Sequence, residues 1–279
     1  MILSKKIIAD YQPMLNDYVR NAWFKKHIQN LAPNKTFVDV GAGIGILSAY
    51  ALEAGATHVH AIEINKDAST VGKHILSNLG YSDRLTWSNE DFKQVNLKTA
   101  NVVIAEQVGP ALFDELQLDL WRHYNKIFGQ DYISIPDELS VDLYIYEGNR
   151  TMFVDQYIQN NETFPHGFYS TLEKLSIQPD KVIENFVSIT NKSADQEKIE
   201  RTIMLDSFDQ ATLVFVNKIG YKKDYHYLNH SSTQPWRYPP RLLITDCSQP
   251  VTIYWNPALS NKENPCDSLY KGYWDTKPA

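Results

Sequence analysis

A glycine-rich turn between an apolar stretch and a helical pattern constrains the fold of this 279-residue chain more than any other feature. The apolar run 37–40 passes directly into Gly41, Gly43 and Gly45, and a helical pattern begins just after them. Glycine tolerates the backbone conformations of a tight turn, and its missing side chain lets a ligand approach the backbone. The free amide groups of the following helix can then bind a polar or anionic ligand. The sequence therefore predicts a strand, a ligand-binding turn and a helix in this order.

The residues on both sides of this turn alternate between strand-like and helical patterns. Strands are expected at 36–40, 58–62, 85–88 and 102–105, and helices at 13–30, 47–54, 68–79 and 111–128. Alternating units of this length predict a doubly wound, Rossmann-like parallel sheet with helices on both faces.

The second half of the chain has a different pattern, in which turn residues separate short strand-like stretches. These stretches are 139–147, 182–190, 201–205, 211–219, 241–245 and 251–255. Such a succession predicts a β-barrel or β-sandwich. We therefore expect an α/β domain over residues 1–135 and a β-rich domain over 136–279. Residues 156–174 fit neither pattern and are interpreted as an insertion or an arm.

Charge and cysteine content exclude several functional classes. The 27 basic and 33 acidic residues give a net charge of −6, and no run of Lys or Arg exceeds two residues. Nucleic acid is therefore an unexpected partner, because phosphate binding needs a concentrated basic surface. The two cysteines, Cys247 and Cys266, form no CxxC pair, so neither a disulfide framework nor a metal site is expected. Since no long uncharged apolar run occurs, we expect no membrane partner and a soluble cytoplasmic protein.

The spacing of the glycines and two later acids indicate the kind of cofactor. A dinucleotide fingerprint would need glycine at position 46, which is Ile46, whereas GxGxG is typical of nucleoside-binding methyltransferases. NAD is therefore the less favoured cofactor. Glu63 ends the second predicted strand, where a carboxylate can accept hydrogen bonds from both ribose hydroxyls. Asp91 follows the third strand and is assigned to the adenine amino group, although both acids could instead be solvated surface residues.

Two carboxylates surround a turn after the fourth predicted strand. Glu106 ends that strand, Gly109 and Pro110 form the turn, and Glu115 lies in the first turns of the next predicted helix. Two close carboxylates repel each other unless a cation lies between them. A guanidinium fits this position, because its planar donors pair with carboxylates in a bidentate manner. The alternative is that Glu115 merely stabilises a helix N-terminus while Glu106 is an exposed strand end.

These residues resemble motifs of the type I protein arginine N-methyltransferases, a class I S-adenosylmethionine-dependent family. The resemblance extends from about residue 14 to 143 and more faintly to about 255. The segments that carry it are 14–20, 38–48, 61–63, the double-glutamate loop 105–115 and the junction into the family's β-barrel at 135–137.

The resemblance implies S-adenosyl-L-methionine as cofactor and assigns the residues around it. Arg20 would bind the methionine carboxylate, and Glu63 the ribose. The full set of implied cofactor-binding residues is Met14, Arg20, Asp39, Gly41, Gly43, Gly45, Leu47, Glu63, Ile64, Asp91, Phe92 and Glu106.

The resemblance also assigns the acceptor site and a partner. Glu106 and Glu115 would be the catalytic residues and would bind the substrate together with Trp236. Residues 156–174 take the place of the family's dimerisation arm, which implies a homodimer.

The departures from the family pattern cluster around the acceptor rather than the cofactor. Gln107, Val108 and Pro110 replace a tryptophan, a methionine and a tyrosine, and Pro235 replaces a histidine. The family's aromatic lid motif has no counterpart, because the residues before Met14 contain one aromatic, Tyr11.

The leading hypothesis is an S-adenosylmethionine-dependent N-methyltransferase acting on a guanidino group, either of arginine in a protein or peptide or of a free arginine-like metabolite. Two alternatives remain open. One is a small-molecule methyltransferase with a non-guanidino acceptor, and the other is a cofactor-binding module without enzymatic activity.

Overall fold

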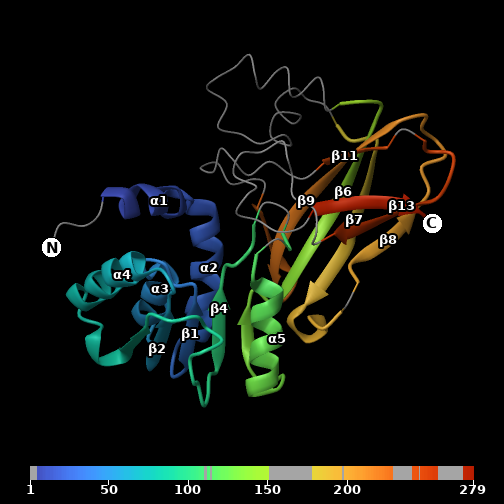
Figure 1. The fold of residues 1–279 in the computed structure, drawn as a ribbon. Helices are drawn as coiled ribbons and strands as arrows, with labels where there is room; N and C mark the ends of the chain where they lie inside the picture. The colour runs from blue at the N-terminus through green and yellow to red at the C-terminus, as the bar shows by residue number, and fades with distance from the viewer. Residues whose placement is uncertain are drawn as a thin grey trace. The chain divides into compact units, whose positions relative to one another are not determined.

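The computed structural model describes residues 5–109, 112–113, 115–150, 178–196, 198–228, 241–244, 246–256 and 273–279 (Figure 1). The chain divides into two units, and the division does not follow a single point in the sequence. The first unit contains Met1–Gln107, Gln117–Asp137 and Gly220–Asp224. The second contains Val108–Leu116, Glu138–Ile219 and Tyr225–Ala279.

A five-stranded parallel sheet forms the centre of the first unit. Its strands are β1 (Thr36–Val40), β2 (His58–Ile62), β3 (Leu85–Ser88), β4 (Val102–Ala105) and β5 (Ile133–Ile135), in the order β3-β2-β1-β4-β5 (Figure 1). The side chains of β4 are all buried, as expected of a parallel strand covered on both faces. The strand order reverses between β1 and β4, and ligands of doubly wound sheets bind at the carboxyl ends of the strands at such a point. The predicted Rossmann-like sheet is thus confirmed.

The helices of the first unit differ from the prediction in two places. They are α1 (Lys5–Asn16), α2 (Tyr18–Leu31), α3 (Ile46–Glu53), α4 (Lys66–Asn78) and α5 (Gln117–Phe128), with a short 3-10 turn η1 (Ser82–Arg84). None of the helices in the described ranges is both long and apolar enough to cross a bilayer.

The single helix predicted at 13–30 is wrong, because the chain breaks at Asp17. The Asp17 side chain accepts a hydrogen bond from the backbone N–H of Arg20 at 3.1 Å and so caps a new helix. The helix predicted from residue 111 begins only at Gln117, because Leu112 has a positive φ of 70° that no α-helix accommodates.

Two sheets make up the second unit. One has the order β10-β9-β6-β7 with β11 paired to β9, and the other has the order β13-β12-β8. The strands are β6 (Glu138–Glu147), β7 (Lys181–Thr190), β8 (Glu200–Ile203), β9 (Ala211–Tyr221), β10 (Asp224–Tyr227), β11 (Arg241–Ile244), β12 (Val251–Asn256) and β13 (Tyr273–Pro278), with a 3-10 turn η2 (Asn191–Ser193). The pairs β6–β7, β9–β11, β12–β13 and β8–β12 are antiparallel. The predicted arm at 156–174 lies outside the described residues.

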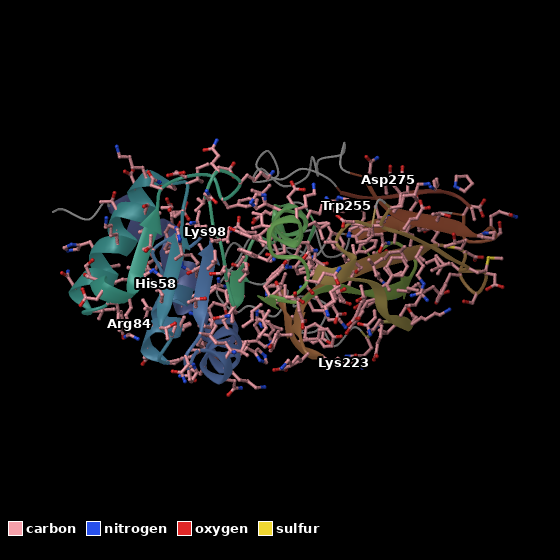
Figure 2. All side chains as sticks on the ribbon, turned by 90° about the horizontal axis from the view of Figure 1, so that it is seen from below. His58, Arg84, Lys98, Lys223, Trp255 and Asp275 are labelled. Carbon is pink, nitrogen blue, oxygen red and sulfur yellow. The ribbon has the colours of Figure 1, made fainter. Side chains whose placement is uncertain are left out.

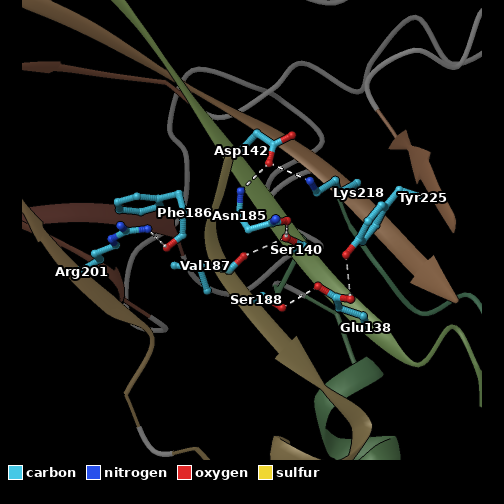
Figure 3. A network of polar contacts seen from close by, with 10 residues as sticks. All are labelled: Glu138, Ser140, Asp142, Asn185, Phe186, Val187, Ser188, Arg201, Lys218 and Tyr225. Carbon is cyan, nitrogen blue, oxygen red and sulfur yellow. Dashed lines mark hydrogen bonds and ion pairs between the residues drawn. The ribbon is translucent and has the colours of Figure 1, made fainter. Parts of the chain in front are cut away.

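A polar network crosses the first of these sheets (Figure 3). Asp142 of β6 accepts hydrogen bonds from the Lys218 ammonium group and from the backbone N–H of Asn185, both at 2.7 Å. Lys218 also lies 4.6 Å from the ring centroid of Tyr225. The side chains of Asp142 and Lys218 are 3% and 4% exposed, so this ion pair is part of the interior of the second unit.

Candidate active site

The glycine turn leads from the carboxyl end of β1 into α3 at the edge of the sheet where a ligand is expected. Gly41, Gly43 and Gly45 all have positive φ angles, of 68°, 57° and 85°, which favour glycine over any residue with a side chain. The backbone N–H groups of Gly41 and Ala42 donate to the carbonyl of Ile62 at 2.9 and 3.0 Å. The turn is therefore held against the end of β2.

Two side chains lie directly on this turn. A Cβ atom at Gly43 would overlap the ring of Tyr11, and one at Gly41 would overlap the carboxamide of Gln107. Burial raises the pKa of Tyr11 to about 12, with Glu63 adding to the shift, so its hydroxyl stays protonated at neutral pH. Tyr11 had no role in the sequence interpretation. Its only signal was its place as an aromatic residue just before Met14.

Glu63 is fixed by backbone groups on both sides of its carboxylate. One oxygen accepts from the N–H of Gly43 at 2.8 Å and the other from the N–H of Asn65 at 2.6 Å. Asn89, which sequence reasoning missed, donates from its amide to the carbonyls of Glu63 and Ile64 at 2.7 and 3.1 Å. Each carboxylate oxygen can accept more than one hydrogen bond. Glu63 can therefore hold the turn and still bind a hydroxyl group of a ligand.

Arg20 and Glu106 form a buried ion pair that the sequence did not predict. Arg20 Nη2 lies 2.9 Å from Glu106 Oε2, and each side chain is only 7% exposed. Arg20 Nη1 donates to Asn21 at 2.9 Å, and the guanidinium lies 5.1 Å from the centroid of the Phe24 ring. Arg20 Nε is buried and has no hydrogen-bond partner among the described residues. Arg20 thus orients the Glu106 carboxylate, and the Nε donor of Arg20 remains for an anionic ligand.

The other predicted cofactor residues lie in varied surroundings. Asp39 is buried on β1 and accepts a hydrogen bond from the Ser48 hydroxyl at 2.6 Å, which connects β1 to α3. Leu47 is buried in α3, and the carbonyl of Met14 accepts from Asn21 at 2.9 Å. Ile64 is 69% exposed at the end of β2. Asp39 is therefore a buried residue that supports the start of α3 and is not exposed at the surface of the turn.

Burial raises the pKa of Asp39 to about 6, although the hydrogen bonds from Ser48 oppose the shift. Because the folded-state pKa exceeds the unfolded value of about 3.9, protonation stabilises the fold at low pH. This contribution is lost as the pH rises through 6. We expect the free energy of unfolding of the wild type to fall by about 1–2 kcal/mol relative to Asp39→Asn between pH 5 and 7.5.

Urea denaturation at both pH values measures this difference. Asp83→Asn, at an exposed position on η1, is the matched control and should follow the wild type. Parallel pH dependences of wild type and Asp39→Asn would contradict a titrating Asp39.

Asp91 and Phe92 follow β3, as predicted, but differ in what they contact. Asp91 accepts from the backbone N–H of Lys93 at 2.9 Å and is half-buried. Phe92 is buried against α5, with its ring centroid 5.4 Å from that of His123 and 6.2 Å from that of Tyr124. Within the described ranges, no cluster of three or more His, Cys, Asp or Glu side chains could hold a metal ion.

The two predicted catalytic glutamates belong to different units. Glu106 lies in the first unit, and Glu115 is half-buried in the second, within the loop Val108–Leu116. Pro110, Trp236 and Pro235 lie outside the described residues.

Comparisons with known proteins relate the first unit to methyltransferases. Residues 23–125 match the family model for ribosomal protein L11 methyltransferase (PrmA). Histone-arginine methyltransferase CARMER of Anopheles gambiae is 29% identical over 158 residues, which cover 55% of this chain and 25% of that protein. Probable protein arginine N-methyltransferase 1.2 of Arabidopsis thaliana is 34% identical over 137 residues, which cover 47% of this chain and 37% of that protein. The chain thus spans between 25% and 37% of the length of these curated relatives.

Solved structures extend the similarity of fold to nearly the whole chain. The crystal structure of PRMT6 matches with a TM-score of 0.71 at 17% identity, covering 98% of this chain and 99% of that one. The enzyme–prozyme heterotetrameric complex of Trypanosoma brucei PRMT1 with AdoHcy matches with a TM-score of 0.63 at 18% identity, covering 96% and 97%. The chain is therefore similar in sequence to protein arginine methyltransferases and has the two-domain α/β fold of these solved structures, a Rossmann-like parallel sheet followed by antiparallel sheets.

Proposed function

We propose that this chain is an S-adenosyl-L-methionine-dependent N-methyltransferase whose acceptor is a guanidino group of a protein, a peptide or an arginine-like metabolite. The observation that carries the proposal is the buried Arg20–Glu106 pair at the carboxyl end of β4. This pair places a cationic donor, Arg20, beside an oriented carboxylate, Glu106. The cation can bind the carboxylate group of the cofactor, and the carboxylate can bind a cationic acceptor.

The residues of the first unit fit this cofactor. The buried Nε of Arg20 can donate to a carboxylate, Glu63 can accept from ribose hydroxyls, and Asp91 can accept from an adenine amino group. The turn at Gly41 and Gly43 offers backbone without side chains. When bound, S-adenosylmethionine supplies a methyl group on a positively charged sulfur, which is already a good leaving group.

The work left to the protein is to bind and orient the acceptor. Glu106 and Glu115 would accept hydrogen bonds from a guanidinium and draw its charge away from the nitrogen that is methylated. Orientation of reacting groups can lower a barrier by roughly 7–11 kcal/mol. A conventional general base would do poorly before the transfer, because a free guanidinium loses its proton only above a pH of about 12. The proton leaves more easily once the methyl group has been transferred.

The relatives support the same reaction class and suggest an assembly. Their names describe arginine and histone-arginine methyltransferases, and the Trypanosoma brucei relative forms a heterotetrameric complex. We extend the proposal to a homodimer formed through residues 156–174 and to a cytoplasmic location, which suits a chain with only two cysteines.

Mass spectrometry of labelled products tests the proposal. The purified protein is incubated with methyl-labelled S-adenosylmethionine and a panel of free arginine, arginine peptides, cell extract and non-guanidino metabolites. Label on a guanidino nitrogen is expected. Absence of label despite measurable cofactor binding would favour a non-enzymatic module.

A second candidate keeps the methyl donor and changes the acceptor to a non-guanidino group of a small metabolite. It is favoured by the departure at Gln107, where the pattern of the family that the sequence resembles has a tryptophan, and the carboxamide of Gln107 lies against Gly41. Label found only on amine, hydroxyl or carboxylate acceptors would select it over the first.

A further inference from the structure

Glu115 lies in the loop Val108–Leu116, and the two residues that flank this loop, Gln107 and Gln117, are hydrogen-bonded to each other in the first unit. The backbone N–H of Gln117 donates to the carbonyl of Gln107 at 3.0 Å, and the N–H of Gln107 donates to the Gln117 side chain at 3.2 Å. Both glutamines belong to the first unit, whereas Val108–Leu116 between them belongs to the second. The chain therefore passes from the first unit into the second and back again over this loop. The position of Glu115 depends on how the loop packs within the second unit.

The described part of this loop is strained and buried. Leu112 has a φ of 70°, a left-handed conformation that a leucine side chain disfavours, and its N–H donates to the carbonyl of Gly109 at 3.0 Å. Leu112 and Phe113 are both buried. Strain of this kind persists only where surrounding contacts hold the backbone in place. Such contacts must therefore come from the packing of the loop.

Two tryptophans of the second unit supply these contacts. The Phe113 ring centroid lies 5.8 Å from that of Trp255 and 6.0 Å from that of Trp274, with interplanar angles of 70° and 69°. These are edge-to-face geometries in the favourable distance range for aromatic pairs. Trp274 is fully buried and stacks on Phe215 at 4.7 Å, so it belongs to the core. Trp255 is half-buried on β12, and Figure 2 labels it together with Asp275 of β13.

We propose that Phe113 and Trp255 are positioning residues for the acceptor, which act by fixing the loop on which Glu115 lies two residues after Phe113. The inference rests on the proposed function, in which Glu115 binds the guanidino group. Arg20 and Glu63 belong to the first unit and do not depend on this packing. Loss of the aromatic contact therefore weakens acceptor use and leaves cofactor affinity unchanged.

Steady-state kinetics with an arginine acceptor, together with calorimetric titration of S-adenosylmethionine, tests this role. Phe113→Ala and Trp255→Ala are expected to lower kcat/KM for the acceptor by about 10- to 100-fold, because small misplacements of a catalytic group have effects of this size. The Kd of the cofactor stays at the wild-type value. Trp255→Phe keeps an aromatic edge and restores most of the activity.

Tyr254→Phe is the matched control on the same strand. Its hydroxyl donates to Asp275 at 2.8 Å, and adjacent residues of a strand point to opposite faces. The variant should have wild-type kinetics. Because Trp255 is only half-buried, its variants are expected to fold even if Phe113→Ala does not, and circular dichroism checks this.

A double-mutant cycle with Glu115→Asp separates positioning from general destabilisation. If Phe113 acts through Glu115, the two substitutions together reduce kcat/KM by less than the product of their separate effects. Multiplicative effects, or an equal loss of cofactor affinity, would overturn the inference.

The same data distinguish this inference from the proposed function. If the wild-type protein labels no guanidino nitrogen, the proposed function itself fails, and if Glu106→Gln and Glu115→Gln leave guanidino methylation intact, the roles given to the two glutamates fail. If those variants are inactive while Phe113→Ala and Trp255→Ala keep wild-type kinetics, only the positioning role is rejected.

Discussion

Replacement of Asp142 by alanine is expected to lower the free energy of unfolding by about 3–5 kcal/mol. The substitution leaves the Lys218 ammonium group without its carboxylate, at a position where the side chain is only 4% exposed. An unpaired charge in the interior is strongly destabilising, because the charge has lost its hydration and gained no partner.

Asp142 also organises the strand next to it. It accepts the backbone N–H of Asn185, which has a positive φ of 47°, at the place where the register of β6 and β7 shifts between Val141 and Leu143. The side chain of Asn185 in turn lies 3.0 Å from the hydroxyl of Ser140 (Figure 3). Removal of the carboxylate therefore frees a backbone donor as well as a cation, which adds to the expected loss.

Urea denaturation of the single and double variants measures this effect. In Asp142→Val/Lys218→Met both charges are absent, so most of the lost stability should return. The exposed pair Lys277–Glu200, at 2.8 Å, is the control, and Lys277→Ala should leave the unfolding free energy nearly unchanged. Equal destabilisation of the single and double variants would show that packing, and not the buried charge, is responsible.

The first unit could be predicted from sequence in most of its elements, because its signals are local. The strands at His58–Ile62, Leu85–Ser88 and Val102–Ala105 have the predicted bounds. Val102–Ala105 is a short apolar run whose side chains are all buried, as a parallel strand covered on both faces requires, whereas His58–Ile62 and Leu85–Ser88 mix apolar and polar residues and are partly buried. The glycine turn was equally readable, since three positive φ angles require glycine at fixed positions.

Features that depend on distant partners could not be predicted. The strands β10 and β13 carry polar residues, and only their pairing with β9 and β12 defines them. Lys218 and Asp142 are 76 residues apart, and Arg20 and Glu106 are 86 apart, so no local pattern connects them. The helix break at Asp17 was missed because the apolar periodicity continues on both sides of the capping residue.

In the candidate site, too, residues with a local sequence signal could be predicted, and residues whose roles depend on distant contacts could not. Glu63 and the glycines were identified by their places at strand ends, whereas Asn89 and Tyr11 were not, because their roles follow from packing. The assignment of Glu115 to the second unit depends on Phe113 and the tryptophans of β12 and β13, which lie more than 140 residues further along the chain.

Glu106→Gln is expected to reduce turnover with a guanidino acceptor by at least about 100-fold. In the proposed function, the substitution removes the negative charge that pairs with the acceptor, and each charge-assisted hydrogen bond contributes about 1.5–3 kcal/mol. Two such bonds to one guanidinium would account for at least 3 kcal/mol, or roughly a factor of 100. Cofactor binding should change little, because the glutamine carbonyl can still accept from Arg20 Nη2 at the 2.9 Å separation of the native pair.

Turnover with labelled cofactor and calorimetric titration of S-adenosylmethionine measure the two effects separately. Glu63→Gln should show the opposite result, with weaker cofactor binding, because Glu63 holds the turn at Gly43. Glu53→Gln is the control for loss of a carboxylate, since the Glu53 side chain is 55% exposed on α3 and forms a surface ion pair with Lys25 at 3.0 Å. Unchanged turnover in Glu106→Gln would remove the carboxylate from the reaction, because the substitution preserves the size of the side chain and removes its charge and one acceptor oxygen. A parallel loss of turnover and cofactor affinity would instead assign Glu106 to cofactor binding through Arg20.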